Sequence, residues 1–188
     1  MERPRSLGVL PGSFNPPTVA HLELAQAAKR HVDEVLYVAP SALPHKDYFG
    51  ATLEQRIELL EGAEATHSIA STEQGLFIDI ARECREHYGD EVRLFLICGR
   101  DAAERILTWD YGRPGVVREM LREFELLVAR RGGHFDAPPE FRHRIHSLDM
   151  SGHDEVSSSE VRERIARGER WEHLVPDAIV ERVKKIYS

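Results

Sequence analysis

Residues 6–21 read SLGVLPGSFNPPTVAH, and this stretch decides the fold. Its apolar start, residues 7–10, predicts a buried β-strand. The prolines stiffen the loop that follows, and Thr18 can cap a helix that carries His21 in its first turn. A strand, a stiff loop and a helix N-terminus in this order favour anion binding, because free N–H groups and the helix dipole attract phosphate.

Gly12 in this loop permits either a positive φ or a close approach of the backbone to a neighbour. The imidazole of His21 can donate from Nε2 to a phosphate oxygen at the start of the helix. The other interpretation is an ordinary strand-to-helix turn, with Thr18 as a cap and His21 on the surface. The spacing alone does not separate these two interpretations.

Apolar runs alternate with amphipathic segments along the rest of the chain. Strands are expected at residues 6–10, 34–39, 67–71, 92–98, 125–129 and 143–148. Helices are expected at residues 19–31, 53–65, 77–87, 101–107, 116–124, 157–167 and 177–186. Strands that alternate with helices predict an α/β fold: a Rossmann-like, doubly wound, mostly parallel sheet with helices on both faces. Ligands of such sheets bind outside the carboxyl ends of the strands.

The composition fits a single domain over residues 1–188. Hydrophobic residues make up 41% and charged residues 30% of the chain, and no apolar run approaches the roughly 20 residues of a membrane helix. The two cysteines, Cys84 and Cys98, lack the CxxC spacing, which indicates a reducing, cytoplasmic setting. The net charge of −7 argues against nucleic acid as a partner. The sequence does not decide whether the protein forms a homo-oligomer.

A second candidate anion site, VSSSEVR, lies at residues 156–162. Ser157 can cap a helix, and Glu160 has the spacing of a capping box. Hydroxyl groups and free amides at a helix start, with Arg162 one turn in, can bind phosphate. The other interpretation is a plain cap with a solvated arginine, which this segment taken alone favours.

Both segments resemble motifs of the nucleotidyltransferase superfamily. GSFNPPTVAH resembles its G-x-F-x-P loop and [HT]-x-x-H, with Thr18 and His21 at the first and last positions of the second motif. VSSSEVR resembles its I-S-S-T-x-[IV]-R segment, which binds the triphosphate. The resemblance implies one nucleotidyltransferase domain, with His21 and Thr18 as catalytic residues and helices over residues 157–188 that complete the phosphate site. It also implies phosphate contacts by Gly12, Ser13, Phe14, Ser157, Ser158, Ser159 and Arg162.

Segments in the middle of the chain resemble the nicotinate/nicotinamide mononucleotide adenylyltransferases, so the resemblance spans nearly the whole chain. These segments are PSALPHK (residues 40–46), ICGRD (97–101), ILTW (106–109) and LVARRG (127–132). The resemblance implies nucleotide or phosphate contacts by Lys46, Gly99, Asp101 and Arg130. It also implies that Trp109 stacks on the pyridine ring, although a lone tryptophan is more often buried in a core.

One segment departs from that family. The bacterial nicotinate enzymes carry T-x-D-T where this chain has residues 77–80, FIDI, and this stretch lines the nicotinate ring. Asp79 remains, which implies that it contacts the mononucleotide. Phe77 and Ile80 replace both hydroxyl side chains with apolar ones. The sequence therefore leaves nicotinate and nicotinamide open as the acceptor base.

The resemblance implies that a mononucleotide phosphate attacks the α-phosphorus of ATP and releases pyrophosphate. The attacking phosphate is already ionised near neutral pH, because its second pKa is about 6, so positioning and charge stabilisation suffice. The implied partners are ATP and a pyridine mononucleotide, with Mg²⁺ carried by ATP. The alternatives are another member of the superfamily, such as a phosphopantetheine adenylyltransferase or a cytidylyltransferase, and a nucleotide-sensing module without turnover.

Overall fold

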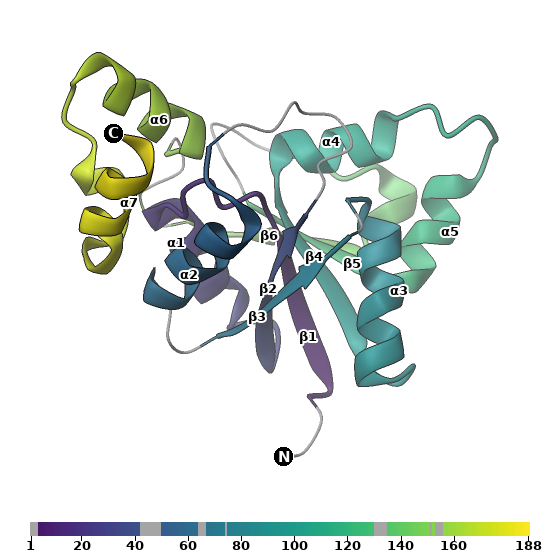
Figure 1. Cartoon of the computed structure of the whole chain (residues 1–188). Coiled ribbons are helices and arrows are strands. Elements are labelled where there is room, and N and C mark those ends of the chain that lie inside the picture. Colours follow the sequence, from purple (N-terminus) through teal and green to yellow (C-terminus); the bar gives the residue numbers. More distant parts are fainter. Residues whose placement is uncertain are drawn as a thin grey trace.

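The computed structural model describes residues 4–41, 50–63, 67–73, 75–129, 135–150, 152 and 156–188. Its centre is a six-stranded sheet in which every pair of neighbouring strands is parallel (Figure 1). The strands are β1 (Ser6–Pro11), β2 (Glu34–Pro40), β3 (Ser68–Thr72), β4 (Arg93–Gly99), β5 (Glu125–Ala129) and β6 (Ile145–Leu148). Their order, β3-β2-β1-β4-β5-β6, is that of the Rossmann fold. The predicted doubly wound α/β sheet is confirmed.

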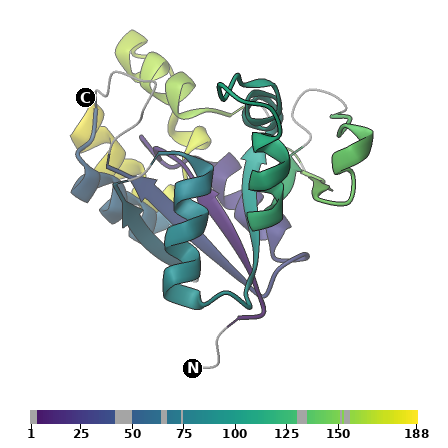
Figure 2. The same cartoon turned by 90° about the vertical axis from the view of Figure 1, so that its right-hand side faces the viewer.

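Seven α-helices surround the sheet within the described residues. They are α1 (Val19–Ala28), α2 (Leu53–Ala63), α3 (Phe77–Tyr88), α4 (Arg100–Thr108), α5 (Val116–Glu123), α6 (Ser158–Arg167) and α7 (Val180–Tyr187). α3, α4 and α5 pack on one face, α1 and α2 on the other, and α6 and α7 pack against α2 (Figure 1, Figure 2). None of these described helices is long and apolar enough to cross a membrane.

Strand β4 shows why this segment of the sequence is almost entirely apolar. Side chains of a strand point alternately to the two faces of the sheet. Leu94, Leu96 and Cys98 pack in the core under α3 and α5, whereas Phe95 and Ile97 pack in the core under α1. Because helices cover both faces, a polar side chain at any of these positions would be buried.

Both cysteines are free, and both are buried. Burial raises the pKa of the Cys84 thiol to about 11 and that of the Cys98 thiol to about 12. Both thiols therefore stay protonated at neutral pH and act as small apolar packing groups.

The boundaries differ from the predicted ones mainly at helix ends. α1 ends at Ala28, three residues before the predicted end, and residues 177–186 divide into a 3₁₀ turn, Asp177–Ile179, followed by α7. Short 3₁₀ turns are common where an α-helix begins or ends. They shift element boundaries without changing which segments are helical.

The winding of the sheet reverses between β1 and β4, the position at which doubly wound sheets have their ligand crevice. The chain winds from β1 through β2 to β3 on one side, and from β4 through β5 to β6 on the other. The loop of residues 12–18 follows β1, and α4 follows β4 directly, so both lie at the carboxyl edge where the winding reverses. This reversal point is where open α/β sheets bind their ligands.

Candidate active site

Hydrogen bonds to carbonyl groups fix the loop of residues 12–18. Arg56 of α2 is 1% exposed, and it donates from Nη1 to the carbonyl of Ser13 (2.9 Å) and from Nη2 to that of Pro40 (3.0 Å). One guanidinium thereby joins the segments that follow β1 and β2. A buried carbonyl without a donor costs about 1–3 kcal/mol, so Arg56 helps to set the shape of the loop.

The C-terminal helices α6 and α7 contact this loop. Ser158, at the start of α6, donates its hydroxyl to the carbonyl of Pro16 (2.7 Å), and Arg162 donates from Nη1 to the carbonyl of Asn15. Tyr187, at the end of α7, donates its hydroxyl to Oδ1 of Asn15. Helices α6 and α7 accordingly lie beside α2 at this edge of the molecule (Figure 1). The structure thus brings together the two predicted anion sites.

His21 lies in the first turn of α1, and Thr18 fixes the orientation of its ring. The backbone N–H of Thr18 donates to Nδ1 (3.0 Å), and the Thr18 hydroxyl lies 2.8 Å from the same nitrogen. A ring nitrogen that accepts hydrogen bonds carries no proton, so the ring proton is on Nε2. The Nε2–H group is therefore a donor at a helix N-terminus, the position that suits phosphate binding.

Thr18, predicted to be catalytic, and Phe14, predicted to contact phosphate, both lie buried beside His21. Both residues are 0% exposed. The Phe14 ring packs edge-on against the ring of His21, with centroids 5.1 Å apart, and against Tyr37 at 5.6 Å. A Cβ atom on Gly12 would lie 2.9 Å from the Phe14 ring. Gly12 therefore permits a close approach of the Phe14 ring rather than a positive φ. Phe14 and Thr18 both contact the ring of His21.

The three serines at the start of α6 have different surroundings. Ser157 is the N-cap, and its hydroxyl accepts from the backbone N–H of Glu160 (3.1 Å). The Glu160 carboxylate accepts from Arg164 (3.0 Å), so only half of the predicted capping box forms among the described residues. Ser159 is exposed and accepts from Nη2 of Arg162 (3.2 Å). Ser159 and Arg162 are thus the polar side chains that this helix start presents outward.

Gly99 and Asp101 lie on the other side of the crevice, at the start of α4. Gly99 is the N-cap residue and has an extended backbone. The Asp101 side chain is 85% exposed and lies 3.7 Å from Nε of Arg100. The helix dipole favours a carboxylate in the first turn, and the exposure of Asp101 leaves it accessible to a ligand.

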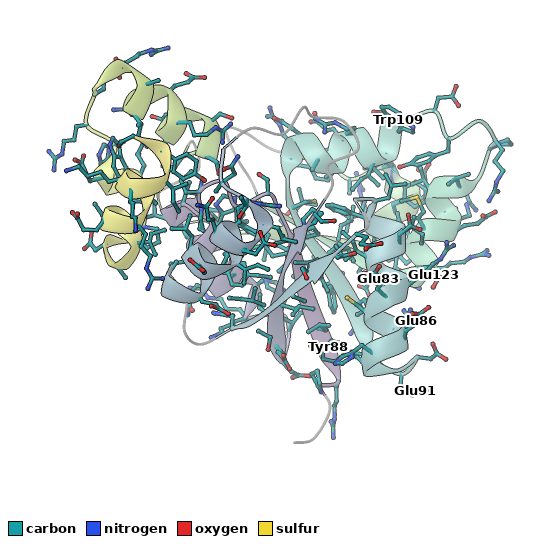
Figure 3. All side chains as sticks on the ribbon, viewed as in Figure 1. Glu83, Glu86, Tyr88, Glu91, Trp109 and Glu123 are labelled. Carbon is teal, nitrogen blue, oxygen red and sulfur yellow. The ribbon has the colours of Figure 1, made fainter. Side chains whose placement is uncertain are left out.

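An apolar cavity of about 320 Å³ lies between α4 and the starts of α3 and α5. Phe77, Ile106, Trp109 and Tyr111 are among the residues that line it. Trp109 is 52% exposed, which excludes a place in the core. Figure 3 shows this side chain at the end of α4, on the same side of the sheet as α3. The cavity therefore has an aromatic wall, and stacking of Trp109 on the ring of the acceptor stays a prediction.

Only one of the two apolar replacements in residues 77–80 changes this cavity. Phe77 lines the cavity, whereas Ile80 is 1% exposed in the core beneath α3. Asp79 is not among the residues that line the cavity, and its carboxylate lies 3.7 Å from Arg82. The contact of Asp79 with the mononucleotide stays a prediction.

Comparison with known proteins identifies the family. The model of the cytidylyltransferase-like family matches residues 9–164. A probable nicotinate-nucleotide adenylyltransferase of Moorella thermoacetica is 30% identical over 97% of this chain and 90% of its own length. One of a Geobacter species is 32% identical over 95% of both chains. The chain belongs to the cytidylyltransferase-like family, among the nicotinate-nucleotide adenylyltransferases.

Two solved structures share the fold of this family member. Both are nicotinic acid mononucleotide adenylyltransferase of Plasmodium falciparum. The complex with NaAD has a TM-score of 0.69 at 17% identity and covers 94% of this chain and 95% of its own. The complex with APC has a TM-score of 0.66 at 16% identity and covers 96% of both.

Two further points bear on the predicted phosphate contacts of this family member. Lys46 and Arg130, both predicted phosphate contacts, lie outside the described residues. Within the described part of the chain, no group of three or more His, Cys, Asp or Glu side chains could hold a metal ion. The side chains gathered at the loop, His21, Ser158 and Arg162, are hydrogen-bond donors, which suit phosphate oxygens rather than a cation.

Sequence reasoning missed three residues that hold the loop of this family member, namely Arg56, Asn15 and Tyr187. Arg56 carried a signal, because it lies three residues after Leu53 and four before Leu60, which puts it on the apolar face of α2. A charged side chain on such a face must find a polar partner. Asn15 and Tyr187 lie 172 residues apart in the sequence, so no local pattern could pair them.

Proposed function

We propose that this chain transfers the adenylyl group of ATP to nicotinate or nicotinamide mononucleotide and releases pyrophosphate. The product is a dinucleotide, so the reaction belongs to NAD biosynthesis. The names of the relatives support this activity. The observation that carries the proposal is the meeting of the loop before α1 with the start of α6, which gathers His21 and Arg162 where the winding of the sheet reverses.

His21 has the central catalytic role in this proposal. Its Nε2–H donates to the triphosphate and stabilises the charge that develops when the α-phosphorus is attacked. Thr18 acts through His21, by holding Nδ1 as an acceptor. No general base is needed, because the attacking phosphate monoester is already ionised.

The start of α6 binds the β and γ phosphates in this proposal. Ser159, Arg162 and the free N–H groups of the first turn contact phosphate oxygens. Ser157 contributes as the helix cap and Ser158 by fixing the loop. In this way the helices of residues 157–188 complete the phosphate site of one nucleotidyltransferase domain over residues 1–188.

The remaining nucleotide contacts come from segments around the crevice, namely Gly12, Ser13, Lys46, Gly99, Asp101 and Arg130. Mg²⁺ is carried by the phosphates of ATP and by water, since the side chains at the loop are donors. When bound, this ion neutralises charge on the triphosphate. We also propose a cytoplasmic location, which suits two free, buried thiols.

Pyrophosphate release tests the proposal. The purified protein is incubated with ATP, Mg²⁺ and one acceptor at a time: nicotinate mononucleotide, nicotinamide mononucleotide or phosphopantetheine. We expect release with a pyridine mononucleotide and none with phosphopantetheine. Release with phosphopantetheine alone would move the protein to another activity of the superfamily. ATP binding without release for every acceptor would make it a nucleotide sensor.

A further inference from the structure

Among the described residues that line the apolar cavity beside Trp109, Arg105 has the one charged side chain. Its walls are otherwise apolar or aromatic, with Phe77, Trp109 and Tyr111 supplying three aromatic rings. At about 320 Å³ the cavity is at the small end of ligand sites. It is therefore suited to one flat ring that carries a group complementary to a guanidinium.

Arg105 shares the cavity-lining face of α4 with Trp109. Ala102, Arg105, Ile106 and Trp109 all line the cavity, and their spacing of three, four and seven residues is that of one helix face. The nearby Arg113 is paired, since it contacts Glu119 through two hydrogen bonds. For Arg105, no carboxylate of the described residues lies within salt-bridge distance.

The chemistry of the two candidate acceptors differs at one group only. Both carry a pyridinium ring, which is cationic and flat, so the aromatic faces of the cavity attract both. Nicotinate adds a carboxylate, which can accept two hydrogen bonds from a guanidinium. Nicotinamide adds a neutral amide, which leaves the guanidinium beside a cationic ring without compensation.

We infer that Arg105 makes this site select nicotinate mononucleotide over nicotinamide mononucleotide, by pairing with the carboxylate of the ring. The inference rests on the proposed function and adds to it a residue that determines the acceptor. It also offers a way to recognise the ring substituent without the hydroxyl group that Phe77 replaces in the cavity. The ring keeps its aromatic contacts, and its substituent is recognised from α4 instead of from α3.

The test compares kcat/KM for the two acceptors in the wild type, Arg105→Gln and Arg105→Lys. In Arg105→Gln we expect kcat/KM for nicotinate mononucleotide to fall about 10- to 100-fold, the effect of losing a charged hydrogen-bond pair. For nicotinamide mononucleotide we expect a change within about twofold, or a gain, because a like charge is removed. Arg105→Lys keeps the charge and should retain part of the preference. Arg118→Gln, on the exposed side of α5, is the matched control.

Each outcome bears on a separate claim. Equal losses for both acceptors in Arg105→Gln would overturn the inference, because they would mean that the side chain only packs against the cavity. A wild type that prefers nicotinamide mononucleotide would overturn it as well. No pyrophosphate release from the wild type with either acceptor would instead overturn the proposed function, and this inference with it. Circular dichroism and the KM for ATP establish that each variant is folded.

Discussion

Basic side chains have opposite roles at the carboxyl edge of the sheet, where the strands end, and at its amino edge, where the strands begin. At the carboxyl edge, Arg56 and Arg162 donate to backbone carbonyls of the loop before α1. At the amino edge, three basic side chains surround the carboxylate of Glu125, which is only 5% exposed as a residue. One edge holds a loop that lies at the predicted ligand site, and the other joins strands to one another.

Glu125 begins β5 and connects it with β4 and β6. Its carboxylate accepts from Nη2 of Arg93 (2.8 Å) and from Nε2 of His146 (2.6 Å), and Nη1 of Arg144 lies 3.5 Å away. Burial by itself would raise the pKa of Glu125, but the hydrogen bonds from His146 and Arg93 and the nearby positive charges lower it below its ordinary value of 4.5. The carboxylate therefore stays ionised at neutral pH.

The difference lies in what each edge offers to an anion. A carboxylate offsets the charge of the cations that bind it, whereas a carbonyl satisfies the donors of a guanidinium and leaves its charge in place. Arg162 can thus hold the loop and attract phosphate at the same time. We expect substitutions at the carboxyl edge to impair the reaction, and substitutions at the amino edge to impair stability.

The largest effect is expected from removing the donor of His21. In His21→Ala the Nε2–H group is lost, and we expect kcat to fall about 100-fold or more, as for the loss of one donor to a transition state. In His21→Asn we expect the same loss of kcat. This side chain still offers an acceptor to the N–H of Thr18, so the melting temperature of the variant should match that of the wild type. Pyrophosphate release at saturating substrate and thermal unfolding provide the two measurements.

A matched variant separates the two ring nitrogens of His21. The amide nitrogen of His21→Gln lies near the position of Nε2, so this variant should recover part of the rate that His21→Asn loses. Unchanged turnover in His21→Ala would exclude His21 from catalysis and leave the carboxyl edge without the group that distinguishes it.

The second effect concerns the contact between α6 and the loop. In Arg162→Gln we expect kcat/KM for ATP to fall about 10- to 30-fold, because both the bond to Asn15 and the charge near phosphate are lost. Arg164→Gln is the control, since Arg164 lies on the same helix but pairs with Glu160. Equal losses in the two variants would show that the helix matters only as a whole.

The third effect separates the ring side of the site from its phosphate side. In Trp109→Ala we expect KM for the mononucleotide to rise about five- to tenfold through loss of stacking on a cationic ring. The KM for ATP should not change. In Trp109→Phe, the KM for the mononucleotide should lie between the values of the wild type and Trp109→Ala. Steady-state kinetics with each substrate varied in turn give the answer. A matching rise in the KM for ATP would contradict a ring-specific role.

The carboxyl edge was predictable where its features depend on local pattern. The apolar run of β4 predicts a strand buried on both faces, and the handedness of crossovers limits how such strands can be ordered. His21 and Arg162 were each recognised at a helix start. Their common target was implied only by resemblance to a family, because no local pattern relates Arg162 to Asn15 of the loop, 147 positions away in the sequence.

Features that depend on packing between distant segments were not predictable. Phe14 has a φ of 47°, in the left-handed region that residues other than glycine rarely adopt. Its burial against His21 and Tyr37 offsets that strain. The place of Arg105 could not be foreseen either, since the cavity beside it needs parts of three helices.

The smallest effect on the reaction is expected at the amino edge. In Glu125→Gln, kcat and both KM values should stay within error, because the side chain lies at the opposite end of the strands. The free energy of unfolding at neutral pH should fall by about 1–2 kcal/mol, since charged hydrogen bonds are lost while their cationic partners remain partly solvated. Urea unfolding gives the value. Loss of activity at full stability would remove the contrast between the two edges.

The pH dependence of the loss of stability in Glu125→Gln tests whether this loss is electrostatic. The folded state lowers the pKa of Glu125, so the stabilisation is complete above its ordinary value of 4.5 and is lost as the pH falls below it. The gap in unfolding free energy between the wild type and Glu125→Gln should therefore narrow below about pH 4.5. Glu119→Gln removes an exposed partner of Arg113, and the free energy of unfolding of this variant should equal that of the wild type within measurement error. A gap at Glu125 that persists in acid would mean that the side chain acts by its shape, and that the amino edge is held by packing and not by charge.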